Sequence, residues 1–450
     1  MDPITLAKQI VEEAAADGAE IEVFIQEGTE TTIGVSNREV EKLSQSGSRG
    51  MGVRAIVDGQ QGYAYTADLS DESVRRTWQT ALELAQVATA DEFRRLPDPQ
   101  PVPDEDLQIH DPALSEVPVT AKVDFIKRLE AAALDYDERI LTTVMCTYID
   151  QSAHIVLANS KGFSGAYDSS VVVGYLMAIA RGEDGEMTQA FGLDASPIFS
   201  ALDAQAIGQE GARKALSMLN AKPVPTQKTT VVLDHVVGAQ ILYAISQALT
   251  ADSWQRSRSF LMGRMGQQVG SDMVSIVDNG RLARGIASAP FDGEGVPTGA
   301  TRLIDEGVLQ GVLHDSYTAA KDGTASTGNA QRSGHTGLPS LGASNFYIQP
   351  GYLSRDEIIA GVQDGFYVLE VMQTGGVDPV TGDCSMSASG IWIKDGQLTD
   401  PVNGVTIATT LDDFLMHISA VGSDLRQMPI VGGIAVPTLR VDNVTVGGEG

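Results

Sequence analysis

Apolar and polar positions divide the first 90 residues into a helical segment, an alternating segment and a second helical segment. From Asp2 to Gly18 apolar side chains recur every three or four positions, which predicts an amphipathic helix capped by Asp2. From residue 20 to 66 they alternate with polar side chains, which predicts strands with a turn at Asp58-Gly59. After Ser70, a candidate helix cap, the helical spacing returns. We therefore predict a helix–meander–helix unit over residues 1–90.

A proline-rich segment separates this unit from a second one with the same order of elements. Residues 91–119 hold six prolines among acidic residues, which predicts an extended linker over the surface. Helical spacing then covers about 120–136, alternation covers 140–193, and a helix is expected at about 202–219. The second helix–meander–helix unit thus spans residues 120–222. Its order suggests an old duplication, although short α/β segments also produce such an order by chance.

Residues 226–450 consist mostly of short apolar runs bounded by glycine and other turn formers, which predicts strands and tight connections. Two helices interrupt them. One is expected at about 236–249, and another begins after Ser354, where Glu357 completes a capping box. The predicted fold class is α+β: an N-terminal α/β region of helices and antiparallel strands, followed by a β-rich C-terminal domain.

Composition and charge limit the classes of function. The chain has 450 residues with 31 basic and 59 acidic side chains, a formal net charge of −28, so a nucleic-acid backbone would be repelled and no direct nucleic-acid partner is expected. The most apolar run, residues 231–249, is interrupted by polar residues, so we expect no membrane span. Cys146 and Cys384 are far apart and the N-terminus is unlike a signal peptide, which predicts a cytoplasmic protein without a disulfide framework.

The glycine-rich stretch from 283 to 332 is the first candidate for chemistry. Asp292 and Glu294 lie two apart within the sequence DGEG, where glycine lets the backbone come close to a ligand. The stronger interpretation from sequence is a solvated acidic turn. A calcium loop is not supported, because the twelfth position counted from Asp292 is Leu303 instead of glutamate.

Six blocks stand out in this half of the chain: SAPFDGEGVPT from residue 288, HDSYTAAK from 314, STGNA from 326, GGVDPVTGDCSMSASGIWIKDGQ from 375, VTIATTLDDFL from 405 and AVGSDL from 420. These blocks resemble the PmbA/TldD family, the "modulator of gyrase" proteins, and particularly its TldE (PmbA) branch. Because they occur in the family's order over much of the chain, together they are far more specific than any single block.

The catalytic TldD branch carries an HExxxH motif on a helix and a later cysteine, which together bind zinc. This sequence has no HExxxH motif, and by approximate alignment its positions fall near Tyr243, Ala244 and Ala248. None of these side chains can bind zinc or move a proton. The resemblance therefore implies no catalytic and no metal-binding residue in this chain. The six histidines are His110, His154, His235, His314, His335 and His417. None lies within one or two helical turns of another.

The resemblance implies that this chain pairs with a TldD-like, zinc-bearing subunit through its C-terminal β domain, around an enclosed chamber that degrades or trims unfolded peptides. One alternative is a homodimeric peptide-binding protein without protease activity. Another is an enzyme with a non-metal mechanism, with Cys384 as nucleophile, although no histidine adjoins it in sequence.

The family-like blocks are rich in glycine and other turn formers, as expected for backbone that lies close to a partner or a peptide, and they give the candidate residues for such contacts. They are Phe291, Asp292, Glu294, Gly295, His314, Thr327, Gly328, Asn329, Gly375, Gly376 and Asp383.

Overall fold

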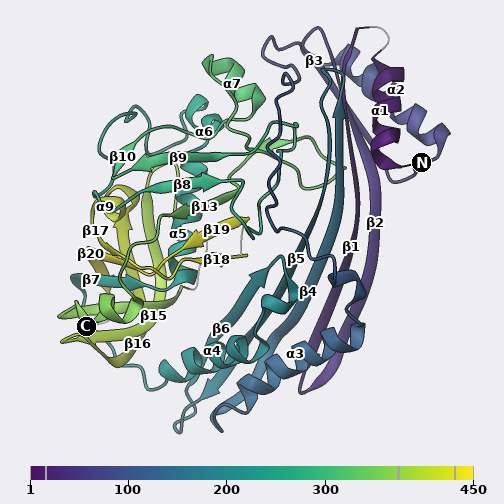
Figure 1. Cartoon of the computed structure of the whole chain (residues 1–450). Coiled ribbons are helices and arrows are strands. Elements are labelled where there is room, and N and C mark those ends of the chain that lie inside the picture. The colour runs from purple at the N-terminus through teal and green to yellow at the C-terminus, as the bar shows by residue number, and fades with distance from the viewer. Residues whose placement is uncertain (1, 16–17, 372–375, 430–431, 449–450) are drawn as a thin grey trace.

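The computed structural model describes residues 2–15, 18–371, 376–429 and 432–448. Its N-terminal half is built on one antiparallel sheet in the order β3-β2-β1-β4-β5-β6, which both helix–meander–helix segments share (Figure 1). The pairing of β1 with β4, from Glu22 opposite Asn159 to Gly34 opposite Thr147, joins the two segments. The strands are β1 (Glu20–Ser36), β2 (Glu39–Val57), β3 (Gln60–Thr66), β4 (Ile140–Asn159), β5 (Ser164–Arg181) and β6 (Met187–Ser196).

Helices cover this sheet at its two ends. One pair packs on the start of β1 and the end of β2 through a cluster that includes Ile10 and Val23, and the other packs on β4, β5 and β6 through a cluster that includes Ile126 and Ile207. Figure 1 shows the pairs at opposite ends of the long strands. The helices are α1 (Pro3–Ala14), α2 (Asp71–Val87), α3 (Val119–Leu134) and α4 (Ala204–Ser217), with short 3-10 turns at Leu114–Glu116 and Phe199–Ala201.

The local signals in the sequence explain where these helices begin. Asp2 accepts a hydrogen bond from the backbone N–H of Thr5 and Pro3 occupies the first turn of α1, as predicted. Ser70 is the N-cap residue of α2, but its hydroxyl donates to Asp68 and makes no capping bond. The position of the cap was therefore predicted correctly, whereas the capping bond expected of its side chain is absent from the structure.

The proline-rich segment between α2 and α3 connects the sheet to the C-terminal domain. Leu96, Leu107 and Ile109 on this segment are buried. The carbonyl of Leu107 accepts from the N–H of Arg284, and the carbonyl of Ile109 accepts from the N–H of Ser170. The segment therefore contacts both halves of the molecule with its backbone as well as with its apolar side chains.

The C-terminal domain contains two mixed six-stranded sheets, in the orders β10-β9-β8-β13-β19-β18 and β16-β15-β14-β7-β20-β17. Its strands are β7 (Gln227–Leu233), β8 (Ile276–Asn279), β9 (Ala300–Asp305), β10 (Val308–Leu309), β11 (Ala330–Gln331), β12 (Ser340–Leu341), β13 (Asn345–Ile348), β14 (Asp364–Val371), β15 (Asp383–Lys394), β16 (Gln397–Thr410), β17 (Ile418–Val421), β18 (Arg426–Met428), β19 (Gly433–Val436) and β20 (Leu439–Gly447). Its helices are α5 (His235–Ala248), α6 (Ala251–Gln255), α7 (Ser316–Asp322), α8 (Arg355–Ala360) and α9 (Leu411–Met416).

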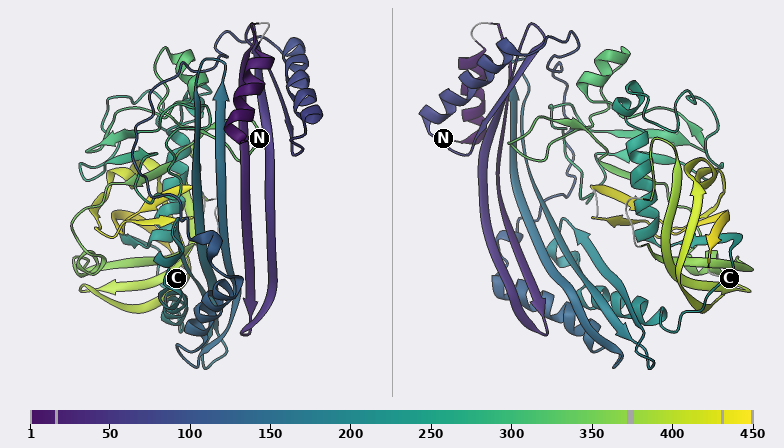
Figure 2. Two further views of the ribbon diagram at one scale, coloured as in Figure 1. Left: turned by 45° about the vertical axis from the view of Figure 1, so that its right-hand side comes forward. Right: turned by 180° about the vertical axis from the view of Figure 1, so that it is seen from behind.

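Helix α5 packs in the core between these sheets, where Val237, Ile241 and Ile245 belong to the largest buried apolar cluster. The C-terminal domain lies against one face of the long sheet (Figure 2). The structure confirms the α+β class with a β-rich C-terminal domain, and α8 begins at the predicted Ser354–Glu357 capping box. Within the described residues, no helix is long and apolar enough to cross a membrane.

Candidate functional site at the junction of the two halves

The DGEG turn lies at the contact between the long sheet and the C-terminal domain, and it is buried. Asp292 and Glu294 are 6% and 3% exposed, so the interpretation of a solvated turn was wrong. Gly295 has a φ of +82°, and a Cβ atom there would lie 2.7 Å from the ring of Phe163 on the sheet side. The carboxylates are buried by parts of the chain that are distant in sequence, which no local pattern reveals.

Asp292 holds the turn in place through three backbone hydrogen bonds. One carboxylate oxygen accepts from the N–H groups of Glu294 at 2.9 Å and Val296 at 3.0 Å, and the other accepts from Ala330 at 3.0 Å. Burial and the nearby Glu294 carboxylate raise the pKa of Asp292, while the three N–H donors act in the opposite direction. Asp292 thus joins the turn to β11.

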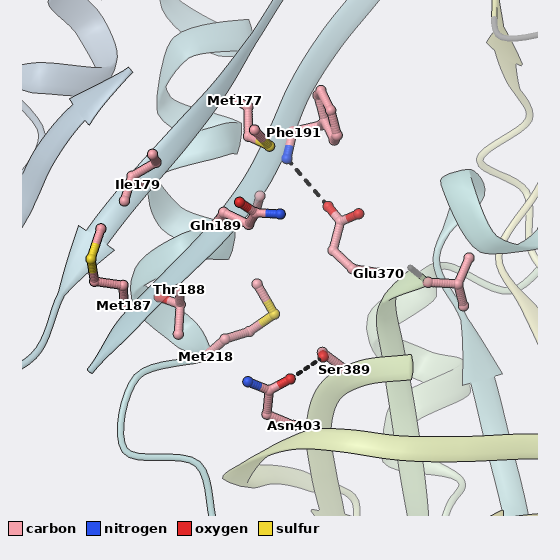
Figure 3. Close-up of a pocket in the computed structure, with 12 residues that line it drawn as sticks. Met177, Ile179, Met187, Thr188, Gln189, Phe191, Met218, Glu370, Ser389 and Asn403 are labelled. Carbon is pink, nitrogen blue, oxygen red and sulfur yellow. Dashed lines mark hydrogen bonds between the residues drawn. The ribbon is translucent and has the colours of Figure 1, made fainter. Parts of the chain in front are cut away.

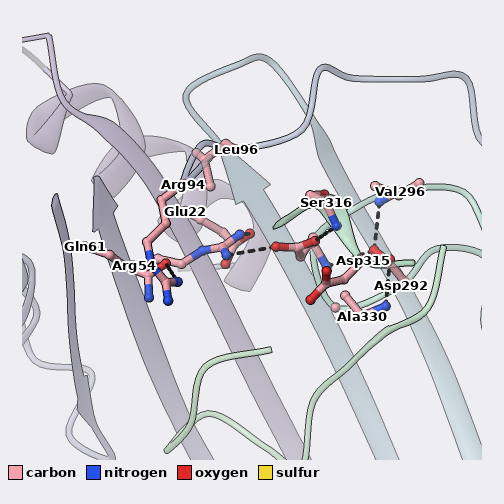
Figure 4. Close-up of polar contacts among 12 residues, drawn as sticks. Glu22, Arg54, Gln61, Arg94, Leu96, Asp292, Val296, Asp315, Ser316 and Ala330 are labelled. Atoms are coloured by element: carbon pink, nitrogen blue, oxygen red, sulfur yellow. Dashed lines mark hydrogen bonds and ion pairs between the residues drawn. The ribbon is translucent and has the colours of Figure 1, made fainter. Parts of the chain in front are cut away.

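Glu294 belongs to a buried ion-pair chain, which we define as Glu22, Arg54, Glu294 and Arg332. Arg54 on β2 donates to Glu294 at 2.9 Å and to Glu22, its cross-strand neighbour on β1, at 2.7 Å. Arg332 also pairs with Glu22. Figure 4 shows Glu22 and Arg54 facing Asp292 and Asp315 across the junction. With two cations and two carboxylates, all at most 6% exposed, the chain is balanced in charge.

The second oxygen of Glu294 accepts from the backbone N–H of Ser316 at 3.0 Å. Burial would raise the pKa of Glu294, but Arg54 and Ser316 hold it below its ordinary value. The buried ion-pair chain therefore connects both strands of the first hairpin to the DGEG turn and to the start of α7. Sequence reasoning missed Glu22, Arg54 and Arg332, and the available signal was a charged residue inside the apolar run VRAIV.

His314, Thr327 and Asn329 form a hydrogen-bonded group behind the DGEG turn. The hydroxyl of Thr327 accepts from the backbone N–H of His314 at 2.8 Å and donates to the side-chain oxygen of Asn329 at 2.6 Å. Asn329 donates to the buried Asp278 at 2.6 Å. Burial lowers the pKa of His314 and raises that of Asp278, a residue that sequence reasoning missed. This group fixes loop shape and offers no evident proton-transfer pair.

The structure thus brings together most of the predicted residues. Phe291 packs against Phe163 with ring centroids 5.1 Å apart, and Gly328 has a φ of +75° where a Cβ atom would lie 2.6 Å from the carbonyl of Pro297. Gly376 and Asp383 do not belong to this group: Gly376 precedes β15, and Asp383 is the exposed first residue of that strand. Gly375 lies outside the described residues.

A cavity of about 370 Å³ adjoins the buried ion-pair chain. Its lining includes Arg54 and Glu294, Tyr317 of α7 and Gln247 near the end of α5. Tyr317 donates to Asp91 at 2.7 Å. The walls therefore present fixed donors and acceptors of both charges, which suits the binding of a polar main chain more than bond cleavage.

The residues of α5 do not fit the zinc site that the family resemblance suggests for the catalytic branch. Tyr243 is 37% exposed, while Ala244 and Ala248 are buried, and the alanines have no ligand atom. Within the described parts of the chain, no three His, Cys, Asp or Glu side chains are grouped so that they could hold a metal ion. The donor set along α5 therefore offers no site for the metal.

The thiol of Cys384 is buried in β15, and burial raises its pKa to about 12. A thiol in this state is almost entirely protonated at neutral pH and is a poor nucleophile. The geometry thus argues against the alternative of a cysteine-based enzyme.

Known proteins match this sequence over most of its length. Residues 226–448 match the PmbA/TldA metallopeptidase C-terminal domain, 112–219 its central domain and 21–85 its domain 1. The metalloprotease PmbA of Escherichia coli O157:H7 is 30% identical over 447 residues, with 96% of each chain covered. A PmbA homolog of Haemophilus influenzae is 29% identical, covering 98% of this chain and 94% of its own.

The fold has also been seen before. The crystal structure of TldE from Thermococcus kodakarensis superposes with a TM-score of 0.86 at 22% identity, covering 98% of this chain and 100% of that chain. Sequence and fold together define a metallopeptidase-type chain of three consecutive domains. The chain belongs to the PmbA/TldD family, as its sequence blocks predicted.

The replacement of Asp292 by asparagine (Asp292→Asn) is expected to lower the free energy of unfolding by about 1–3 kcal/mol, because the amide nitrogen would face a buried N–H donor. An amide has one acceptor oxygen, whereas both carboxylate oxygens of Asp292 accept backbone hydrogen bonds. Chemical denaturation followed by circular dichroism measures the loss. Asp383→Asn, at an exposed carboxylate, is the control and should change stability by less than about 0.5 kcal/mol. Equal effects of the two changes would show that the three N–H bonds contribute nothing.

Proposed function

We propose that this chain is the subunit without zinc in a two-chain metallopeptidase, and that a related TldD-like chain supplies the zinc. The proposal is carried by helix α5, where the positions aligned with HExxxH hold Tyr243, Ala244 and Ala248. Ala244 and Ala248 have no atom that could bind zinc or activate water, and Tyr243 alone cannot form the site. The family relationship supports metallopeptidase chemistry for the assembly, so the catalytic group is assigned to the other chain.

In the proposed assembly this chain shapes the chamber and holds an unfolded peptide. The polar cavity beside the buried ion-pair chain supports this role, because its walls are fixed by buried contacts between the two halves of the molecule. An extended peptide can be held through its backbone with little sequence preference. Degradation or trimming of unfolded peptides is the corresponding activity of the pair.

The test mixes the purified chain with a TldD-like protein from the same organism and follows cleavage of an unfolded peptide. We expect a complex on size-exclusion chromatography and chelator-sensitive cleavage by the mixture, with neither chain active alone. A partner whose HExxxH glutamate is changed to glutamine serves as the control, and should still form the complex without cleaving the peptide.

Two results would contradict the proposal. Full activity of the partner alone, with no complex, favours the homodimeric peptide-binding protein instead. One tightly held zinc ion per chain in the isolated protein after dialysis, measured by metal analysis, would place metal chemistry in this chain and direct attention to its histidines.

A further inference from the structure

A second cavity, of about 420 Å³, lies between the edge of the long sheet and the C-terminal domain. On the sheet side it is lined by residues of β5 and β6 and by Met218 just after α4; on the other side by residues of β14, β15 and β16. Figure 3 shows side chains from both sides pointing into the space between them. None of the residues predicted from the sequence lines this cavity.

Three methionines stand out on the sheet side of the cavity. Met177, Met187 and Met218 all line it, together with Phe191 and the branched Ile179 and Thr188. Methionine has three rotatable bonds and a polarisable sulfur, so such a surface adjusts to a flexible alkyl chain. The cavity can therefore accommodate an extended aliphatic stem.

One carboxylate faces this apolar wall without a cation of its own. Glu370 at the end of β14 accepts a hydrogen bond from the backbone N–H of Phe191 at 3.2 Å, and it makes no salt bridge within the described parts of the chain. The residues outside those ranges include no lysine, arginine or histidine. Figure 3 shows its side chain reaching across the cavity toward Phe191.

The neighbouring cations are already bound to other acids. Lys214 lies 3.0 Å from Glu210 and 2.9 Å from Asp234, and Arg426 pairs with Glu210 at 2.8 Å. Both cations are thus engaged by Glu210 or Asp234, and neither makes a salt bridge to Glu370. Burial raises the pKa of Glu370 to about 7, opposed by the field of Lys214. A cation brought by a ligand would pair with this carboxylate directly.

We propose that this cavity binds the side chain of a lysine or arginine from an extended peptide, with the alkyl stem on the methionines and the cationic head at Glu370. Long cationic side chains divide in this way between an apolar surface and a polar end. Strand β6 is the edge of its sheet. Its Phe191 N–H and Leu193 carbonyl are bonded to Glu370 and Arg426, so an extended peptide would pair with the part of the edge before Phe191, beside Met187 and Gln189 of the cavity wall. The inference rests on the proposed function only in taking a peptide as the ligand.

The test uses the isolated chain and short unstructured peptides that differ at one central residue: lysine, arginine, norleucine or glutamate. Norleucine keeps the alkyl stem and removes the charge. We expect the lysine and arginine peptides to bind roughly 10- to 100-fold more tightly than the norleucine peptide in titration calorimetry, as one charge-assisted hydrogen bond implies. The glutamate peptide should bind most weakly.

Glu370→Gln is expected to abolish the preference for lysine over norleucine, since the amide can still accept from Phe191 but carries no charge. The matched control is Glu183→Gln, which removes the same charge from an exposed turn between β5 and β6 and should retain the preference. The inference is overturned if the lysine peptide does not bind, if lysine and norleucine peptides bind equally, or if Glu370→Gln keeps the preference. Because no partner chain is present, these results are separate from the test of heterodimer activity.

Discussion

Replacing Arg54 by methionine (Arg54→Met) is expected to lower the free energy of unfolding by about 3–5 kcal/mol, one of the two largest effects predicted for this chain. Methionine fills much of the same volume but leaves Glu294 buried without a cation and Glu22 with Arg332 alone. The loss is large because the remaining charge cannot reach water. Urea denaturation measures it as a lower midpoint with an unchanged slope.

The control for Arg54 lies on the same strand. Arg49 pairs with Glu27 at 3.3 Å, but its side chain is 57% exposed. Arg49→Met should therefore change stability by less than about 1 kcal/mol, as is usual for surface ion pairs. The double change Arg54→Met with Glu294→Gln should recover part of the loss, because it removes the unpaired carboxylate. Similar losses in Arg54→Met and Arg49→Met would mean that the buried ion-pair chain does not hold the junction together.

Lys214→Met is the second change with a large expected effect, about 3–5 kcal/mol at neutral pH. Lys214 is 2% exposed and contacts both Glu210 and Asp234. Asp234 in turn caps α5 and accepts from the hydroxyl of Tyr367 at 2.9 Å. Loss of the ammonium group leaves the buried Asp234 without its lysine and Glu210 with Arg426 alone, close to Glu370, which has no salt bridge.

The loss in Lys214→Met should depend on pH in a defined direction. Burial acts to raise the pKa values of Asp234 and Glu210, but Lys214 and other partners hold both below their ordinary values of 3.8 and 4.5. Their contribution to stability is therefore complete above those values and is lost as the pH falls through the lowered pKa values. Denaturation at several pH values should show a gap between wild type and variant that is widest near neutrality and narrows below about pH 4.

An exposed lysine provides the comparison for this change. Lys222 contacts Asp400 at 2.6 Å, but both side chains are more than half exposed, at 63% and 53%. Lys222→Met should alter stability by less than about 1 kcal/mol at any of these pH values. A gap for Lys214→Met that stays constant down to acidic pH would contradict the assignment of its effect to the two carboxylates.

Sequence reasoning predicted those parts of the structure that depend on contacts between residues close together in the chain. The helix starting after Asp2 and the one starting after Ser354 were predicted because their caps lie within three residues of the groups that they bind. The alternation along β5 was visible because it depends only on the strand itself. Elements governed by local hydrogen bonds and periodicity were therefore accessible to sequence reasoning.

The candidate site was predicted only in part, because its energetics depend on distant partners. The DGEG turn has the composition of a solvated loop, and its burial follows from Arg54, which is 240 residues away from Glu294 in the chain. Arg332 reaches Glu22 over 310 residues. Likewise, no pattern around Glu370 indicates that Phe191 and the methionines of β5 and β6 stand opposite it. Family resemblance located the blocks but gave no information about these contacts.

The buried ion-pair chain can form only late in synthesis, because its members are far apart in the sequence. The strand that carries Arg54 leaves the ribosome long before Glu294 and Arg332 exist, and synthesis from residue 54 to residue 332 takes on the order of 15–60 s at typical elongation rates. Throughout that interval the face of the nascent hairpin that holds Glu22 and Arg54 lacks its covering domain and remains hydrated. The N-terminal sheet can form its backbone ladder early, but its junction closes only after translation of about half of the C-terminal domain, and until then this face is open to chaperones and proteases.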